Sequence, residues 1–251
     1  MDSQVFQYQK FIKGLENKYD YTAETIVELN ERFLDCTADP TLRFRWINHP
    51  KYDLAIIAKP TEAFSDGEKQ VLDQFIVNGG KTLWLVDAVQ AEMDSLYNDS
   101  GSILAFPRDL NLNDMFFKYG FRINPALVKD EQAAPIKLAS GERGSATQYE
   151  QYFWKYSPFI YPQSQNPIVK NIEGVRFEFA NPIDTLKNGI KKTILMESSQ
   201  YSKSIGTPIE VSLNMVTEES GPKDYVGGGR IPVSVLLEGK FQSMYDNRVL
   251  P

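Results

Sequence analysis

The sequence predicts an α/β fold in which a parallel sheet is flanked by helices, with a β-rich C-terminal half. Two observations support this class. A strand–helix–strand pattern occupies residues 51–89, and such βαβ units build parallel sheets with right-handed crossovers. After Val128 prolines and glycines become frequent and the apolar runs become short and β-like. We therefore expect a βα region at residues 1–128 and a β-rich extension at residues 129–251, packed on or completing the same core.

The two strands of the βαβ unit are short apolar runs. Leu54–Ala58 ends before Lys59-Pro60, because proline cannot continue a sheet ladder. Leu83–Val86 is the second run, and Asp87 ends it. Runs of this length between turn residues are typical of buried strands.

The helix between these strands has signals at both ends. Ser65 and Glu68 have the spacing of a capping box, in which the hydroxyl and the carboxylate each accept a backbone N–H of the first turn. Gly79-Gly80 supplies the positive φ that ends a helix. The residues expected on its inner face share helical spacing: Val71, Leu72, Phe75 and Ile76.

Three further segments precede the unit. Residues 3–18 are predicted to be helical, with a partly apolar face. Residues 23–30 fit a helix or a strand, and the β-branched run Thr25–Val27 favours a strand. Residues 41–47 are expected to form a short strand that leads into the unit.

A second helix is predicted at Asn111–Tyr119. Asn111 is expected to cap it and Gly120 to stop it. Its expected inner face consists of Leu112, Met115, Phe116 and Tyr119. Beyond Val128 the β-like runs are Pro135–Leu138, Val175–Phe179, Thr193–Met196, Ile209–Leu213 and Ile231–Leu237.

Composition excludes several classes of protein. The formal net charge of −6 argues against a nucleic-acid partner, which normally requires a basic face. No apolar run approaches the roughly 20 residues that cross a bilayer as a helix. With 42% hydrophobic and 24% charged residues, the chain has the composition of an ordinary globular protein.

The residues that usually carry catalysis are scarce. His49 is the one histidine and Cys36 the one cysteine, so a Cys-His or Ser-His mechanism would have to use them. Cys36 lacks the strand–elbow–helix setting of a buried nucleophile, and His49 precedes a proline in a loop. A zinc site built from His and Cys needs three or four such ligands. A carboxylate site for Mg²⁺ or Ca²⁺ stays open, but the acidic residues are scattered. No phosphate-binding or dinucleotide-binding glycine motif occurs. We therefore expect a protein that is not an enzyme and has no metal or cofactor.

A ligand or partner surface is the remaining kind of site. Asp87 follows a parallel strand, at the sheet edge where open α/β sheets bind ligands. Residues 148–161 are dense in aromatic side chains, among them Tyr152, Trp154 and Tyr156. This cluster fits a sugar platform, a partner-binding surface or simply core packing, and core packing is the favoured of these alternatives.

Four blocks of the chain resemble one known family. They are DLAIIAKPTEAFSDGEKQVLDQFIVNGGKTLWLVDAVQAEMDSL, then DLNLNDMFFKYGFRINPALVKD, then FANPIDTL with KKTILMESSQYS, and finally IPVSVLLEGKFQSMYDNR. In this order they resemble GldG, the gliding-motility-associated ABC-transporter auxiliary protein of Bacteroidetes. The likeness covers about four-fifths of the chain, from Lys51 onward, while residues 1–50 match only loosely.

The resemblance implies a non-catalytic extracytoplasmic (periplasmic) domain, tethered to the inner membrane by helices outside this chain. Such a domain works with an ABC permease subunit and, through it, a cytoplasmic ATPase, in gliding motility and the associated secretion. The alternative is the sugar- or peptide-binding domain of a transporter. The resemblance also implies a flavodoxin-like fold, similar to class I glutamine amidotransferases. The family has a further strand before residues 3–18, and its absence here would leave an open sheet edge that a homodimer could cover.

Overall fold

The computed structural model describes residues 52–140, 148–226 and 228–246. These form two compact units. The described part of the first consists of residues 52–86, 109–119 and 240–246, and the second spans residues 87–108 and 120–239. Each unit contains residues from both sides of residue 128. The division into residues 1–128 and 129–251 describes a change in the character of the sequence, and it stays a prediction. Residues 3–18, 23–30 and 41–47, with Cys36 and His49, lie outside the described residues.

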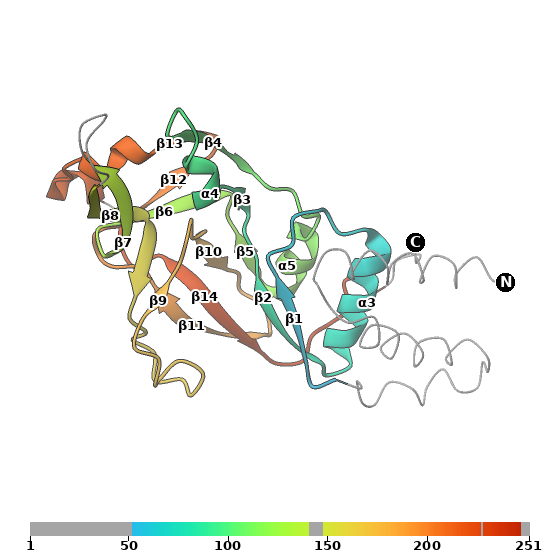
Figure 1. The fold of residues 1–251 in the computed structure, drawn as a ribbon. Coiled ribbons are helices and arrows are strands. Elements are labelled where there is room, and N and C mark those ends of the chain that lie inside the picture. Colours follow the sequence, from blue (N-terminus) through green and yellow to red (C-terminus); the bar gives the residue numbers. More distant parts are fainter. Residues whose placement is uncertain (1–51, 141–147, 227, 247–251) are drawn as a thin grey trace, which may run out of the picture. The chain divides into compact units, whose positions relative to one another are not determined.

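The predicted βαβ unit is confirmed in the first unit. β1 (Leu54–Ala58) and β2 (Lys81–Leu85) pair in parallel, with Ile56 opposite Leu83. α3 (Asp66–Val77) connects them, and Figure 1 shows it alongside the two strands. β2 begins two residues earlier than predicted and ends one residue earlier, at Leu85.

Both ends of α3 follow the predicted signals. Ser65 Oγ accepts the Glu68 N–H at 3.3 Å, and Glu68 Oε2 accepts the Ser65 N–H at 2.6 Å, which closes the capping box. Gly79 has a φ of +94°, which a side chain would strain. Phe75 and Ile76 are buried as expected, whereas Val71 and Leu72 are only half-buried.

α5 (Asn113–Tyr119) is shorter than the predicted Asn111–Tyr119. Its four predicted inner residues, Leu112, Met115, Phe116 and Tyr119, are all buried. Asn111 lies two residues before the helix with a φ of +55°, so its place is the preceding turn and its expected role as the cap is wrong. Gly120, with a φ of +93°, ends the helix as predicted.

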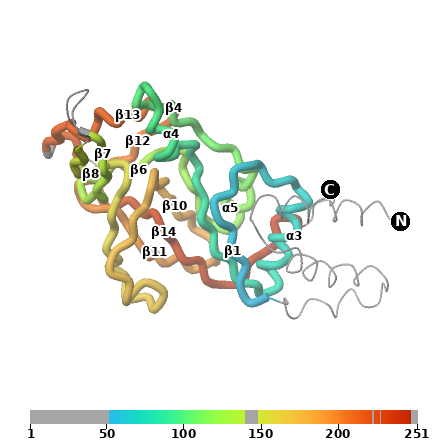
Figure 2. Tube along the Cα trace, viewed as in Figure 1, coloured from blue at the N-terminus to red at the C-terminus, as the bar shows by residue number. Residues whose placement is uncertain are grey.

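The second unit is rich in strands, and its strand pairs are antiparallel: β10–β5, β11–β14, β12–β6, β13–β4–β3 and β7–β8–β9. Figure 2 shows β11 and β14 running side by side although they are far apart in the sequence. The elements are β3 (Val89–Gln90), α4 (Met93–Leu96), β4 (Ser102–Pro107), β5 (Phe121–Ile123), β6 (Ala126–Asp130), β7 (Ala133–Ser140), β8 (Gln148–Ile160), β9 (Val175–Arg176), β10 (Ile183–Thr185), β11 (Lys191–Glu197), β12 (Ser202–Gly206), β13 (Ile209–Ser212), the 3-10 helices η4 (Leu213–Thr217) and η5 (Pro222–Tyr225), and β14 (Pro232–Glu238).

The flavodoxin-like parallel sheet expected from the resemblance is therefore wrong. Among the described residues β1–β2 is the one parallel pair, and the remaining sheets are small and antiparallel. A flavodoxin-like sheet needs a crossover of a dozen or more residues between successive parallel strands. The two-residue links Asn124-Pro125, Glu131-Gln132 and Thr207-Pro208 leave no room for one. The strands on either side of each link pair with other strands instead: β5 with β10, β6 with β12, β7 with β8 and β13 with β4.

Two apolar clusters form the core of the second unit. The larger contains Leu127, Ile136, Trp154, Tyr156, Phe179 and Val211, and the smaller contains Val128, Ile160, Ala180 and Val233. β6 links the clusters, because the adjacent Leu127 and Val128 belong one to each. No described helix is long and apolar enough to cross a membrane.

Candidate interaction surface

The predicted aromatic residues on β8 lie on two opposite faces of the strand. Trp154 and Tyr156 are 1% and 3% exposed, and their ring centroids lie 5.6 Å apart in the core. Each also packs against Phe179 at a centroid distance of 6.4 Å. Successive side chains of a strand point to opposite faces, so any surface on β8 would use the other face.

That other face carries exposed rings. Tyr149 is 70% exposed and Phe153 is 67% exposed. Tyr152, between them, is half-buried on the first face, and its hydroxyl donates a hydrogen bond of 2.6 Å to Glu150 Oε2. This hydrogen bond raises the pKa of Tyr152 above its usual value, because loss of the proton would place two negative charges side by side.

Asp87 lies just beyond β2, at the first residue of the second unit, and is half-buried. The next residue, Ala88, is held within that unit: its N–H donates 2.7 Å to Asn181 Oδ1, and its carbonyl accepts the Arg108 N–H at 2.8 Å. Of the four predicted site residues, Trp154 and Tyr156 thus lie in the core, Tyr152 is half-buried on β8, and Asp87 lies between β2 and β3. A ligand or partner surface built from them stays a prediction.

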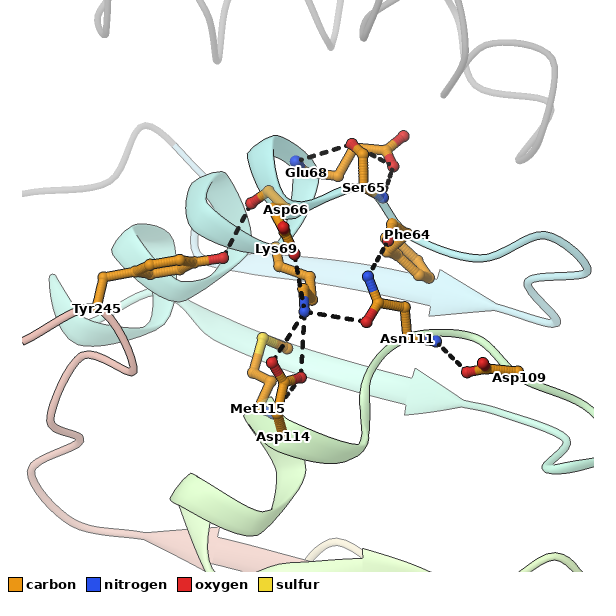
Figure 3. Close-up of polar contacts among 10 residues, drawn as sticks. All are labelled: Phe64, Ser65, Asp66, Glu68, Lys69, Asp109, Asn111, Asp114, Met115 and Tyr245. Atoms are coloured by element: carbon orange, nitrogen blue, oxygen red, sulfur yellow. Dashed lines mark hydrogen bonds and ion pairs between the residues drawn. The ribbon is translucent and has the colours of Figure 1, made fainter. Parts of the chain in front are cut away.

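A buried lysine is the polar feature that sequence reasoning missed. The side chain of Lys69, on α3, is 2% exposed, and its Nζ lies 3.0 Å from Asp114 Oδ2 on α5 and 3.2 Å from Asp66 Oδ1. Figure 3 shows both carboxylates turned toward this ammonium group. A buried lysine requires such partners, because an unpaired charge in the interior is costly.

Asn111 completes the surroundings of Lys69. Its Oδ1 accepts from Lys69 Nζ at 3.3 Å and its Nδ2 donates to the Phe64 carbonyl at 2.7 Å. Asn111 tolerates its left-handed backbone well for a non-glycine residue, and Asp109 Oδ1 accepts its N–H at 2.9 Å. Figure 3 shows Asn111 reaching across from the turn before α5 to α3. The cluster therefore joins two helices and a loop, and its cation is fully engaged.

A second buried cluster lies further along α3. Asp73 is fully buried and accepts hydrogen bonds from Tyr119 Oη at 2.7 Å, Ser243 Oγ at 2.5 Å and the Met244 N–H at 2.9 Å. Burial of the phenol, with its hydrogen bond to Asp73, raises the pKa of Tyr119 far above the usual range. Tyr119 also packs edge-on against Phe241, at a centroid distance of 5.2 Å. These contacts fasten residues 241–244 to α3 and α5.

A third cluster holds the 3-10 segments of the second unit. Lys155 Nζ lies 2.9 Å from Glu131 Oε1 and 2.7 Å from Ser220 Oγ, and the Tyr225 hydroxyl donates to Glu131. Partial burial opposes ionisation of Glu131, but the hydrogen bonds from Tyr225 and Lys155 outweigh it and lower the pKa of this carboxyl. Burial and the hydrogen bond with Glu131 raise the pKa of Tyr225 to about 12. Lys129, paired with Glu218 at 2.8 Å, extends the cluster.

These clusters join helices, strands and loops through ion pairs and hydrogen bonds. Within residues 52–140, 148–226 and 228–246, no group of three or more His, Cys, Asp or Glu side chains is arranged to hold a metal ion. The signal for the Lys69 cluster was present in the sequence, since Lys69, Asp73 and Ile76 share one face of α3 at helical spacing. The partners of Lys69 and Asp73 on α5 could not be inferred from that spacing.

Comparison with known proteins gives one family. Residues 5–251 match the family described as "ABC-type uncharacterized transport system", an auxiliary component of such systems. No curated protein matches the chain. Among solved structures, the mmIFT52 N-terminal domain matches at 16% sequence identity over 62% of this chain and 57% of that chain, with a TM-score of 0.38. At this TM-score the likeness supports no functional assignment.

Proposed function

Because the chain belongs to this family of ABC transport-system auxiliary components, we propose that it is a non-catalytic docking domain of an ABC transporter. Its partners are the permease subunit and, through the permease, the cytoplasmic ATPase. The observation that carries the proposal is the family match, which covers residues 5–251.

The pairing of the largely buried lysines with carboxylates supports a docking role. Lys69 is engaged by Asp66 and Asp114, and Lys155 by Glu131. A lysine that acts as a nucleophile needs an amine free of other partners. The Nζ atoms of Lys69 and Lys155 instead lie within 3.2 Å of carboxylate oxygens. The polar interior of both units therefore serves their rigidity, as a docking scaffold requires.

The finer assignment follows from the four blocks that resemble GldG. On that resemblance we place the domain outside the cytoplasm, tethered to the inner membrane, in a system that serves gliding motility or secretion. We place the partner surface on the face of β8 that carries Tyr149 and Phe153. Both side chains are exposed there, and large aromatic residues are enriched at protein interfaces.

Affinity purification of the tagged, membrane-anchored parent in mild detergent tests the function. We expect the permease and ATPase subunits to be recovered in a fixed ratio. Recovery of the protein without either subunit would overturn the docking function.

The surface has its own test in the double variant Tyr149→Ser/Phe153→Ser. Its matched control is Ile168→Ser/Ile172→Ser, which removes two exposed apolar side chains from another segment of the second unit. We expect the β8 variant to lose at least tenfold in permease recovery while the control keeps the parental yield. Equal recovery from both variants would reject the surface and leave the docking function standing.

A sugar- or peptide-binding domain is the alternative function, and it has less support. Two of the rings that would line its site, Trp154 and Tyr156, lie in the core. A ligand that binds the folded state raises the melting temperature. A glycan and peptide library that produces no such rise would remove this alternative.

A further inference from the structure

One edge of the three-stranded sheet β7–β8–β9 pairs with no further strand among the described residues. The strand order places β7 at this edge, and its register with β8 includes Pro135 opposite Phe153 and Ala139 opposite Tyr149. Every second residue of an edge strand directs its backbone N–H and C=O away from the paired neighbour. β7 therefore offers a row of hydrogen-bonding groups to an added strand.

Pro135 indicates which residues of β7 point toward the open edge. Proline has no backbone N–H, and within a sheet it occurs where its nitrogen faces the unpaired side of an edge strand. Residues two apart on a strand have the same orientation, so Lys137 and Ala139 direct their backbone groups to the same side. An added strand can therefore bond to the Pro135 carbonyl and to the N–H and C=O of Lys137 and Ala139.

The exposed face of the β7–β8 hairpin provides side-chain contacts next to this edge. Its six exposed residues form three cross-strand pairs: Pro135–Phe153, Lys137–Gln151 and Ala139–Tyr149. Pro135 and Ala139 are small, so they leave room above β7 for side chains of an added strand to contact the two rings. Aromatic side chains stabilise strand pairs through such contacts.

Lys137 restricts which strand can join the edge. Its side chain is exposed, and the ion pairs among the described residues do not include it. Pairing of β7 with β7 of a second copy at full overlap would bring two Lys137 ammonium groups together, and like charges opposite each other are destabilising. Lysine on an edge strand opposes self-pairing in this way. An acidic side chain opposite Lys137 is favourable instead.

We propose that β7 binds an extended segment of a partner protein as an additional strand, with an acidic side chain of that segment beside Lys137. The proposal rests on the docking function above and specifies how the partner is held. In this mode of recognition, main-chain hydrogen bonds give affinity and side-chain contacts give specificity. The specific contacts here are Lys137 and the rings of Tyr149 and Phe153.

Substitutions at position 137 separate the backbone contacts from the charge. Lys137→Pro removes an N–H of the open edge and leaves the bonds to β8, whereas Lys137→Ala removes only the charge. In affinity purification of the tagged, membrane-anchored parent, Lys137→Pro and Lys137→Glu should lose at least tenfold in permease recovery, and Lys137→Ala about threefold. The control Gln165→Pro adds a proline at an exposed position outside the strands and should keep the parental recovery.

Melting temperatures of the purified variants show whether the hairpin is intact. A Lys137→Pro protein with the parental melting temperature and the parental recovery would overturn strand addition and leave the docking function standing. Parental recovery from Lys137→Glu, which keeps every backbone group, would overturn the acidic contact. A parent that recovers no permease would overturn both proposals.

Hydrogen exchange in the unaltered protein gives a second measurement, which needs no variant to fold. In the free protein the amides of Lys137 and Ala139 should exchange nearly as fast as in an unfolded chain, and in the purified complex at least tenfold more slowly. Mass spectrometry of a peptide that covers β7 counts the protected amides. Protection in the free monomer would assign the edge to the chain's own residues, and protection that appears on dimerisation would assign it to a second copy. Either result would overturn the proposal, as would unchanged exchange in the complex.

Discussion

The hydroxyl of Ser243 donates a hydrogen bond of 2.5 Å to Oδ2 of Asp73, which lies 170 positions earlier in the chain. Asp73 is fully buried, and its other oxygen accepts from Tyr119 and from the Met244 N–H. The carboxylate is thus the point at which α3, α5 and the segment after Gly239 are joined. It makes the first unit depend on residues from three separate parts of the sequence.

Replacing Asp73 with Ala should lower the free energy of unfolding by about 3 kcal/mol, because it leaves buried donors on Tyr119 and Ser243 without an acceptor. Urea unfolding followed by circular dichroism measures the change. Asp53→Asn, at an exposed position of the same unit, should change stability by less than about 0.5 kcal/mol. An Asp73→Ala protein as stable as this control would contradict the network.

Replacing Lys69 with Met should destabilise the protein by about 1–3 kcal/mol, because it removes the cation that Asp66 and Asp114 share. A double-mutant cycle with Asp114→Ala isolates the pair, and we expect a coupling energy of about 1 kcal/mol. Lys240→Met, at an exposed position, is the matched control and should be nearly neutral. Additive effects of Lys69→Met and Asp114→Ala would show that the two side chains act independently.

Truncating an aromatic side chain should cost much more stability on the buried face of β8 than on its exposed face. Trp154→Ala removes a ring that is 1% exposed and should cost about 3–5 kcal/mol, since a large cavity remains. Phe153→Ala removes a ring that is 67% exposed and should cost less than about 1 kcal/mol. Thermal unfolding of the two variants compares them directly. Similar losses would mean that the alternation along β8 is misassigned.

Acid should weaken the β5–β10 pairing through Asp184. Asn124 Nδ2 at 2.9 Å and Arg122 at 2.7 Å hold the pKa of the Asp184 carboxyl below its usual value. A lowered folded pKa stabilises the protein above the unfolded pKa of about 4. That contribution disappears as the pH falls through the lower, folded pKa.

The isosteric variant Asp184→Asn should therefore be less stable than the parent at neutral pH. The two proteins should converge in stability as the pH falls below the unfolded pKa of about 4 and through the lower, folded pKa of Asp184. Denaturant titrations between pH 7 and pH 2 measure the difference. Glu210→Gln, at an exposed position of β13, is the control for loss of one carboxylate. If the difference in free energy of unfolding between Asp184→Asn and the parent stays the same down to the lowest pH, the role of the Asp184 carboxylate is contradicted.

The elements that were predicted correctly are those whose ends depend on residues close together in the sequence. The bounds of β1 agree with the predicted Leu54–Ala58, since a proline ends the strand. The capping box of Ser65 and Glu68 and the positive φ at Gly79 and Gly120 depend on residues a few positions apart. Within the second unit, β9 covers only Val175–Arg176 of the predicted run at residues 175–179, and Phe179, at the end of that run, has a φ of +50°, outside the extended region.

The candidate site was less predictable than the fold. The density of aromatic residues at 148–161 was visible, but not which of them would be buried. Trp154 and Tyr156 became core residues because β6, β7 and Phe179 pack around them. The Lys69 cluster depends on Asp114, 45 positions away, and no local pattern indicates that pairing.

The sequence by itself determined the βαβ unit, the inner face of α5 and the family to which the chain belongs. Each of these rests on spacing within a single segment or on likeness along the whole chain. The tertiary structure alone decided the antiparallel pairing of the later strands, the burial of Trp154, and the joining of Asp73 to Ser243. These three features depend on which distant segments pack together. That packing is driven by the burial of apolar surface over the whole chain. Local periodicity indicates which side of a helix or strand is apolar, and it leaves open which distant segment packs against that side.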